Sequence, residues 1–331
     1  MNVPAISVII PMYNAEKFID DCLNSLLIQT FQDFEVIVVD DCSTDSSCAI
    51  VEGYAEKFNG RLTLTRTKTN SGGGGYVPRN IGLGLSRGEY ICYLDADDFI
   101  VETALEILYG AAQNFDADVV YTSNYYSYVA DENFSLVPDY EGLRLKENGE
   151  EDIPTLTRDN PNENLRRLFL TDGILHMPWA KFVERRLLVE NEISFPKIIS
   201  GGDFIWTIHL LSCAKKFLRL PIPLYFYRLN ATESVTRKKR APQEQVSTCA
   251  KAFFLGAEAL RDLAGKVDLL AQNTEYFLAA LSPFFVNCLQ RTKDARAQLT
   301  TQEVYEILSR DFGDDSLVPF LFSAYDEKLR S

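Results

Sequence analysis

The sequence predicts an α/β protein, with a mostly parallel twisted sheet that has helices on both faces and a helical C-terminal extension. Runs of β-branched residues alternate with segments of helical period through the N-terminal part of the chain. Polar or acidic residues follow several of the expected strands, and from Pro242 onward most of the chain has the helical period. Strands separated by helices join through right-handed crossovers, so the first half should form a parallel sheet.

The composition is that of a globular protein with a sizeable core. The chain has 331 residues, of which 46% are hydrophobic and 12% aromatic. A net charge of -14 argues against a nucleic-acid partner, because phosphate backbones are bound by clustered Lys and Arg. The basic run at 237–240 is either a solvated loop or a contact for anionic lipid or diphosphate.

The cysteines and the N-terminus indicate an intracellular environment. The seven cysteines are odd in number and form no CxxC pair, so we expect reduced core thiols. No basic segment precedes an apolar run at the N-terminus, and no apolar run approaches the ~20 residues that span a bilayer. We therefore expect a cytoplasmic protein, and a position at the inner face of the membrane stays open.

The first part of the chain should alternate strictly between strands and helices. We expect strands at 6–10, 34–39 and 62–64, with helices at 15–30 and 51–58 between them. Pro11 should end the first strand, and Asn14 stands at the N-cap position of the first helix.

A glycine-rich segment follows the third strand. Residues 70–75, Asn-Ser-Gly-Gly-Gly-Gly, form either a phosphate-cradling loop or a mobile loop that closes over a ligand. The segment lacks the trailing Lys and Ser/Thr of a P-loop, and no GxGxxG motif follows the first strand. Pro78 suits the first turn of a helix that carries Arg79 and Asn80.

Three carboxylates follow the short apolar strand at 91–94. Asp95, Asp97 and Asp98 repel one another unless a cation or several donors compensate, so the cluster is either a divalent-metal site or a polar turn with an N-cap aspartate. Ligands of parallel sheets bind outside the carboxyl ends of the strands. Residues 11–14, 40–41, 68–80 and 95–98 should meet there, which favours the metal. Asp98 should cap the helix expected at 101–115.

The rest of the chain should form two further parts. We expect a first part at 1–115, a second part at 116–240, and the extension at 241–331. The second part holds a strand at 118–126, a polar insertion at 130–164, a helix opening at 179–182, a helix carrying Phe204 through Leu218, and a strand at 224–227 that leads to Arg228. Asp203 is either the N-cap of that helix or an acid at a flexible rim. A helix from Tyr276 to Leu289 should be interrupted at Pro283.

Several ordered motifs together resemble the family-two glycosyltransferases, which have the GT-A fold. The resemblance is strong over roughly the first 110 residues and thinner beyond them. The matching segments are Ser7-Val8-Ile9-Ile10-Pro11-Met12-Tyr13-Asn14, Gln29-Thr30-Phe31, Glu35 to Asp41, Arg79-Asn80-x-Gly82, Gly88 to Asp98, Trp179-x-Lys181, Gly202-Asp203, Tyr227-Arg228 and Ser234-x-Thr236.

The resemblance implies a metal-dependent transfer of a sugar, with inversion, from a nucleoside-diphosphate sugar, usually a UDP-sugar. By that likeness Asp97 ligates Mn²⁺ or Mg²⁺ and Asp203 is the general base. The implied donor-binding residues are Pro11, Tyr13 and Asp41 at the uridine, Arg79 at the base or phosphates, Asp95 at the ribose or metal, and Arg228 and Ser234 in a loop that closes on the diphosphate.

By the same likeness residues 1–115 form the nucleotide-sugar-binding half and residues 116–240 the acceptor-binding half, and the implied acceptor is a glycan or a lipid-linked glycan. A peripheral membrane contact and a homo-oligomer formed through the C-terminal helices stay open. An alternative of another class is a non-catalytic nucleotide-sugar-binding or scaffold module with the same fold. A sugar nucleotidyltransferase should carry a glycine- and lysine-rich loop after the first strand, and Pro11-Met12-Tyr13-Asn14 is not one.

Overall fold

The computed structural model describes residues 3–128, 135–137, 155–158, 174–198, 200–229 and 240–313. Most of the predicted insertion at 130–164, the basic residues 237–239 and the candidate Ser234 lie outside these ranges. The chain forms two compact units. The first comprises Met1–Lys197 and Trp206–Thr232, and the second comprises Ile198–Ile205 and Glu233–Ser331.

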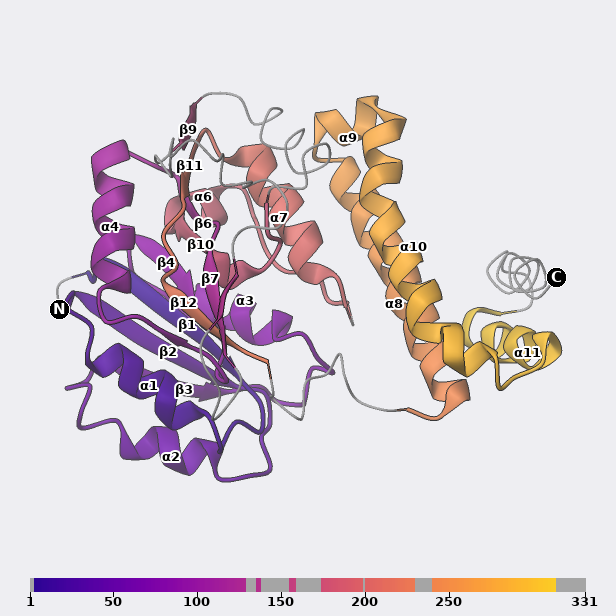
Figure 1. The fold of residues 1–331 in the computed structure, drawn as a ribbon, viewed down its shortest axis with the longest axis horizontal. Helices are drawn as coiled ribbons and strands as arrows, with labels where there is room; N and C mark the ends of the chain where they lie inside the picture. The colour runs from indigo at the N-terminus through magenta and orange to yellow at the C-terminus, as the bar shows by residue number, and fades with distance from the viewer. Residues whose placement is uncertain are drawn as a thin grey trace. The chain divides into compact units, whose positions relative to one another are not determined.

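An eight-stranded sheet forms the centre of the first unit (Figure 1). Strands β9 and β10 run antiparallel to their neighbours and the other pairings are parallel, so the predicted mostly parallel sheet is confirmed. In spatial order the strands are β3 (Leu62–Arg66), β2 (Phe34–Asp40), β1 (Ile6–Met12), β4 (Tyr90–Tyr93), β10 (Lys181–Glu184), β6 (Val119–Thr122), β11 (Lys216–Leu220) and β9 (Thr155–Arg158).

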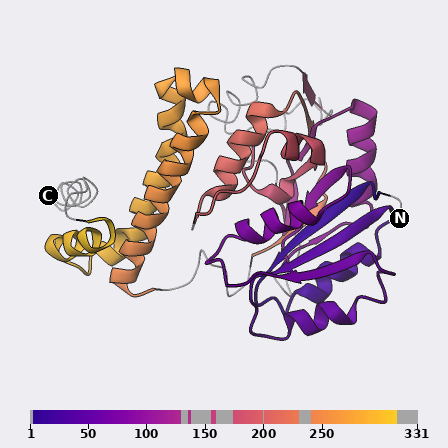
Figure 2. The ribbon, with the colours of Figure 1, turned by 180° about the vertical axis from the view of Figure 1, so that it is seen from behind.

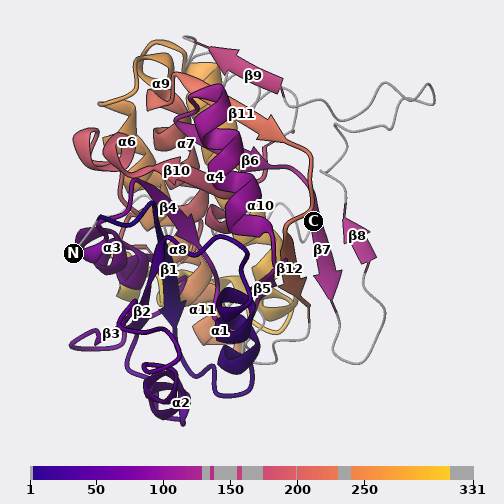
Figure 3. The same cartoon turned by 90° about the vertical axis from the view of Figure 1, so that its left-hand side faces the viewer.

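Helices cover both faces of this sheet, as the alternation of strands and helices predicts. Figure 3 shows α1 and α3 on opposite sides of β1, and Figure 2 presents the face that carries α3. The core therefore surrounds β1 and β2, whose apolar residues are almost entirely buried. The helices of this part are α1 (Ile19–Leu27), α2 (Ser47–Gly53), α3 (Tyr76–Leu85) and α4 (Ala104–Phe115).

A second, four-stranded sheet brings a distant strand to the end of β4. Its order is β5 (Phe99–Ile100), β12 (Tyr225–Arg228), β7 (Tyr125–Tyr128) and β8 (Ser135–Val137). Strand β5 directly follows the acidic cluster, and it pairs antiparallel with β12. This pairing places β12, more than a hundred residues later in the sequence, beside the three aspartates.

Two of the predicted helices in the second part are wrong in extent or type. The segment at 179–182 is a short 3₁₀ turn (Pro178–Ala180) followed by β10, which lies between β4 and β6. A buried central strand is apolar on both faces, so its short run does not distinguish it from a helix. The helix with Phe204 is α7 (Gly202–Cys213), and Leu218 belongs to β11. Helix α6 (Arg185–Glu190) follows β10.

Two expectations near the end of β1 are also wrong. Strand β1 continues through Pro11. Proline has no N–H to donate, but β1 pairs with β4 only from Ile6 to Ile9, so no hydrogen bond to β4 is lost at Pro11. Helix α1 begins at Ile19, and Asn14 is not its N-cap. Asn14 instead accepts a hydrogen bond from the Thr44 N–H at 2.9 Å.

The second unit is helical and has its own core. Helices α8 (Pro242–Ala264) and α10 (Thr274–Arg296) lie side by side, with α9 (Asp268–Gln272) and α11 (Thr301–Phe312) at their ends (Figures 1 and 2). A cluster that includes Val246, Cys288 and Leu308 joins α8, α10 and α11. Helix α10 continues through Pro283, so the predicted interruption does not occur. None of the helices in the described ranges combines the length and apolarity needed to cross a bilayer.

The cysteines have the state that their spacing predicts. All seven are free thiols, and Cys22, Cys92, Cys249 and Cys288 are buried.

Candidate active site

The acidic cluster forms a tight turn at the carboxyl end of β4. Strand β4 ends at Tyr93, and the Asp98 N–H donates to the Asp95 carbonyl at 3.0 Å to close the turn. The three carboxylates have different surroundings, since Asp98 is 1% exposed whereas Asp95 and Asp97 are only partly buried. The turn therefore presents two carboxylates outward and keeps the third inside.

The charge of the turn is only partly compensated by the protein. Burial and the neighbouring Asp95 raise the pKa of Asp97 to about 6, although Arg228 and Arg79 act in the opposite direction. Burial and the charges of Asp97 and Asp95 likewise raise the pKa of Asp98 well above its ordinary value. A cation bound at this turn would relieve the repulsion.

Arg79 is the main cation on one side of the turn. Its Nη2 donates to Asp95 Oδ1 at 2.5 Å and its Nη1 to the Gly74 carbonyl at 2.5 Å, and the residue is 5% exposed. The guanidinium also lies over the Phe195 ring, 5.6 Å from its centroid. Arg79 thus joins the glycine-rich loop, α3 and the acidic turn.

Asp98 does not cap the following helix, contrary to the sequence-based expectation. Helix α4 begins at Ala104 after Thr103, which is too far along the chain for Asp98 to act as its cap. Asp98 instead accepts hydrogen bonds from the Tyr225 hydroxyl at 2.7 Å and from the Arg228 N–H at 2.7 Å. The carboxylate therefore connects the turn to β12.

The side chain of Arg228 lies against the same turn. Its Nε donates to the Asp97 carbonyl at 2.9 Å, and its Nη2 forms an ion pair with Asp21 at 2.8 Å. The guanidinium lies over the Phe18 ring at 5.0 Å, and the residue is buried. Arg228 consequently connects the turn with α1.

Asp41 organises the segment that begins the glycine-rich loop. Its carboxylate accepts hydrogen bonds from the Thr67 hydroxyl, the Ser71 N–H and the Ser71 hydroxyl, and its carbonyl accepts one from the Asn70 amide. Its own N–H donates to the Met12 carbonyl at 2.7 Å, which ties the end of β1 to the end of β2. The contact of Asp41 with the base of a nucleotide stays a prediction.

The glycine-rich loop passes close to both β1 and Arg79. Gly75 has a φ of 66°, and a Cβ there would lie 3.1 Å from the Pro11 Cβ and 3.1 Å from Arg79 Nη1. Only glycine fits this conformation and this approach. Tyr13, two residues past Pro11, is 49% exposed, so its ring is accessible to a ligand.

Phe195 is a central contact that the sequence does not identify. Its N–H donates to Asn80 Oδ1 at 2.9 Å, and its carbonyl accepts from Asn80 Nδ2 at 2.8 Å. Its ring stacks on Trp206 with centroids 4.8 Å apart and meets Tyr93 edge to face. Phe195 lies 115 positions from Asn80, so no local pattern in the sequence indicates this contact.

The two remaining candidates are Asp203 and Ser234. Asp203 is the second residue of α7, so it belongs to the first turn of the helix and is not its N-cap. It lies in the segment grouped with the second unit. Ser234 is outside the described residues. The structure therefore brings together Pro11, Asp41, Arg79, Asp95, Asp97 and Arg228 at one edge of the first unit.

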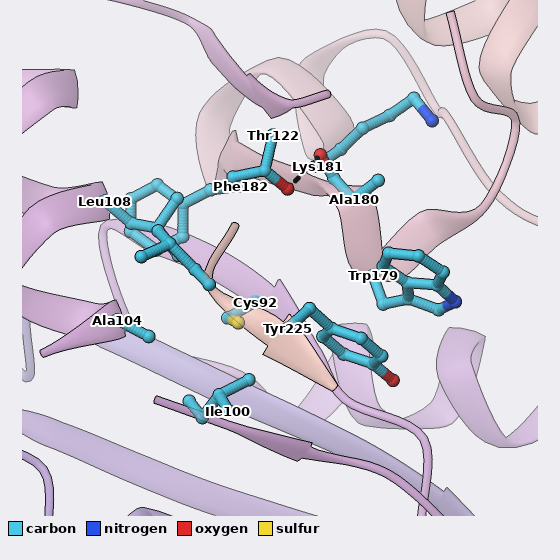
Figure 4. Close-up of a pocket in the computed structure, with 11 residues that line it drawn as sticks. Cys92, Ile100, Ala104, Leu108, Thr122, Trp179, Ala180, Lys181, Phe182 and Tyr225 are labelled. Carbon is cyan, nitrogen blue, oxygen red and sulfur yellow. Dashed lines mark hydrogen bonds between the residues drawn. The ribbon is translucent and has the colours of Figure 1, made fainter. Parts of the chain in front are cut away.

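A small cavity behind β4 belongs to the core and is not a substrate site. Its volume is about 10 Å³, which is close to the minimum that holds a single water molecule. Figure 4 shows mainly apolar side chains around it, with the rings of Trp179 and Tyr225 side by side. Thr122 donates to the Ala180 carbonyl at 3.3 Å on the opposite wall.

The donor set of the acidic turn fits a divalent metal that is shared with a substrate. Across the described ranges no group of three or more His, Cys, Asp or Glu side chains gathers in a way that could enclose a metal ion. Mg²⁺ is usually held by one or two carboxylates together with substrate phosphates, and hard oxygen ligands also suit Mn²⁺. Asp97 and Asp95 provide the one or two carboxylates that such a shared site requires.

Comparisons with known proteins agree with this architecture. The family described as Glycosyl transferase family 2 matches residues 7–182. Glycosyltransferase GlyG of Streptococcus pneumoniae is 31% identical over 224 residues, which are 67% of this chain and 70% of GlyG. Poly(ribitol-phosphate) beta-N-acetylglucosaminyltransferase TarS of Staphylococcus aureus is 49% identical over 102 residues, which are 30% of this chain but only 17% of TarS.

Two solved structures resemble the whole chain. A crystal structure of S. aureus TarS 1-349 in complex with UDP-GlcNAc has a TM-score of 0.58 and 24% identity, and it covers 98% of this chain and 91% of that chain. The mannosyltransferase PcManGT from Pyrobaculum calidifontis in complex with GDP-Man and Mn²⁺ has a TM-score of 0.53 and 18% identity, and it covers 99% of this chain and 81% of that chain. At these identities the likeness shows the fold.

Proposed function

The chain belongs to the family 2 glycosyl transferases and is a glycosyltransferase with the GT-A fold, and from that membership we propose its reaction. It transfers a sugar with inversion from a nucleoside-diphosphate sugar, a UDP-sugar, to a glycan or lipid-linked acceptor, with the assistance of a divalent metal. The observation that carries the proposal is the outward pair Asp95 and Asp97 at the end of β4, with the pKa of Asp97 raised to about 6 and Arg79 and Arg228 close by.

The arrangement of charges suits a leaving diphosphate. Asp97 is the side chain that would ligate Mn²⁺ or Mg²⁺, and Asp95 stands beside it toward the ribose or the metal. A metal held there would supply stabilisation of the negative charge that grows on the leaving diphosphate. Arg79 orients Asp95 through their ion pair and holds the carbonyl of Gly74, which fixes the loop on the donor side.

The uridine would lie at the ends of β1 and β2. The exposed ring of Tyr13 can stack on a base, Pro11 borders the same edge, and a carboxylate at Asp41 can accept an imide N–H. In the present hydrogen-bond pattern the Asp41 carboxylate is occupied by Thr67 and Ser71. A base that binds there would have to share or replace one of these donors.

The acceptor side requires a base because inversion by single displacement needs the acceptor hydroxyl to lose its proton. We assign this role to Asp203, in keeping with a chain that has only two histidines. GlyG and TarS are named as glycosyltransferases, and TarS is named for transfer to poly(ribitol-phosphate). A polyol-phosphate or glycan chain is the corresponding acceptor class for this protein.

Nucleotide binding with and without metal tests the proposal. Thermal unfolding of the full chain would be followed with a panel of nucleotide sugars in Mn²⁺ or in EDTA. A UDP-sugar at about a hundred times its Kd should add about 2.7 kcal/mol to the free energy of unfolding. UDP release in the presence of an acceptor should stop in EDTA and return with Mn²⁺. Release that chelation leaves unchanged would remove the metal from the proposal.

A further inference from the structure

The hydroxyl of Tyr225 bridges two members of the acidic turn. It accepts a hydrogen bond from the Asp95 N–H at 3.2 Å and donates to Asp98 Oδ2 at 2.7 Å. Asp95 and Asp98 are the first and last residues of the turn, so one hydroxyl joins both of its ends. Its hydrogen bonds to the turn therefore run through the Asp95 backbone and the Asp98 carboxylate.

The tyrosine is itself held rigidly. It is 3% exposed, and its ring stacks on that of Trp179 (Figure 4). The ring centroids are 4.2 Å apart and the planes are 10° from parallel. Its strand pairs with β5 on one side and β7 on the other. The hydroxyl therefore has a fixed position relative to the sheet. Its hydrogen bonds hold the turn in a fixed position as well.

The bridge matters because the turn is electrostatically unfavourable. Three carboxylates occupy four consecutive positions, and Asp98 is 1% exposed. Repulsion of this kind favours opening of the turn and rotation of the side chains away from one another. The hydrogen bonds from Tyr225 and from the Arg228 N–H to Asp98 oppose that opening.

We propose that Tyr225 is a positioning residue that holds the Asp95–Asp98 turn in the geometry that receives a metal-bound diphosphate. The inference rests on the proposed function and adds a residue that acts through the turn without touching the ligand. Partners that orient metal ligands in this way typically change metal affinity by about 10- to 100-fold when they are removed. The loss should therefore appear in metal-dependent binding and not in metal-free binding.

The test uses Tyr225→Phe in the full chain, with UDP titrated by calorimetry in Mn²⁺ and in EDTA. The wild type should bind UDP more tightly in Mn²⁺ than in EDTA. Tyr225→Phe should weaken binding about tenfold in Mn²⁺ and leave binding in EDTA within about twofold. A second variant, Asp98→Asn, alters the same bridge from its other end and should show the same selective loss if Tyr225→Phe does not fold.

Tyr90→Phe is the matched control. Tyr90 is 5% exposed and lies at the opposite end of β4, where its hydroxyl donates to the Ala117 carbonyl at 3.2 Å. Its substitution removes a buried hydroxyl and one hydrogen bond at a site remote from the turn, and it should leave the Mn²⁺ enhancement unchanged. An equal loss in Tyr90→Phe would assign the effect to general destabilisation and overturn the inference.

The outcomes separate the inference from the proposed function. If the wild type binds UDP no better in Mn²⁺ than in EDTA, the metal-assisted function and the role of Tyr225 both fail. If the wild type shows the enhancement and both Tyr225→Phe and Asp98→Asn keep it, only the role of Tyr225 fails. A selective loss in Mn²⁺ with the control unchanged supports both.

Discussion

Identical side chains take different roles in the acidic turn because their partners differ. Asp95 is paired with Arg79, Asp97 is only partly buried, and Asp98 is buried against Tyr225 and β12. The pKa of Asp97 is raised to about 6 while Asp98 receives two short hydrogen bonds. Spacing in the sequence identifies the acidic cluster. The different roles of its three aspartates depend on partners that are distant in the sequence.

Glu35 offers a pH-dependent test at a residue remote from the turn. Burial acts to raise its pKa, but hydrogen bonds from the Ser7 hydroxyl and from the backbone and guanidinium of Arg87 outweigh it and lower the pKa. A lowered pKa in the folded state means that the ionised form contributes stability above the unfolded pKa of about 4.3, and that this stability disappears as the pH falls through the folded pKa.

We therefore expect Glu35→Gln to lower the free energy of unfolding by about 1–3 kcal/mol at pH 7. The difference from the wild type should shrink as the pH falls below about 4.3, because the wild-type carboxyl is then protonated as well. Urea unfolding at several pH values measures it. The exposed Glu56→Gln should show no comparable difference, and a loss for Glu35→Gln that is independent of pH would contradict the ionic origin.

At the scale of elements, α3 contains two glycines that differ in their surroundings. A Cβ on Gly82 would lie 2.4 Å from Ile9 Cγ2, and Ile9 is fully buried in β1, whereas a Cβ on Gly84 would meet nothing within 4 Å. Gly82 thus permits the close contact of α3 with β1 that carries Arg79 to the turn. Gly84 has no such role in packing.

Alanine substitution should therefore have opposite effects at the two positions. Gly84→Ala should stabilise the protein by about 0.5–1 kcal/mol, because alanine is the better helix former. Gly82→Ala has the same helical advantage but forces α3 away from β1, which typically costs about 1–3 kcal/mol, so it should destabilise the protein. Thermal unfolding of both variants measures the difference, and equal shifts would show that α3 and β1 are not in close contact.

The elements also show which features a single sequence can predict. The strands β1 and β2 follow from local runs of β-branched residues, and β4 and the turn after it follow from a short apolar run that ends in acids. Strand β10 was predicted as a helix because a short, buried run has no period to distinguish the two. Tyr225 lies 130 positions from Asp95, and no local pattern predicts that such a pair meets. Trp179 was singled out only through the resemblance, and Phe195, which is bonded to Asn80 across 115 positions, was not singled out.

At the scale of the molecule, the segment that carries Asp203 groups with the C-terminal helices. Gly201 has a φ of 84°, and a Cβ there would lie 2.2 Å from the Phe284 ring of α10. A Cβ on Gly256 of α8 would lie 2.5 Å from the same ring, and the rings of Phe204 and Phe284 are 6.2 Å apart. Phe284 therefore packs against both residues that flank Gly202 and Asp203. Through Phe284, the helical extension thus restrains the segment that carries Asp203, the proposed base.

This packing predicts a selective effect of Phe284→Leu on transfer. The smaller side chain leaves the segment at 201–204 without its ring contact, and a displacement of about 1 Å at a catalytic group can cost up to about a hundredfold in rate. We expect kcat to fall by roughly tenfold or more while the Kd for UDP is unchanged, because every residue assigned to the donor except Ser234 belongs to the first unit. Steady-state transfer and calorimetry on the full chain measure the two quantities.

Phe285→Leu is the control on the same helix, because Phe285 packs on the cluster shared by α8, α10 and α11 and on Phe253, 5.5 Å away. It removes a ring of the same size from the same helix, so it should leave kcat within about twofold. Asp203→Asn gives the reference for the size of these effects, since loss of a general base typically lowers the rate by about 10²- to 10⁴-fold. Full activity in Asp203→Asn would remove the base assignment. Equal losses in Phe284→Leu and Phe285→Leu would show instead that the extension supports activity only through its own stability.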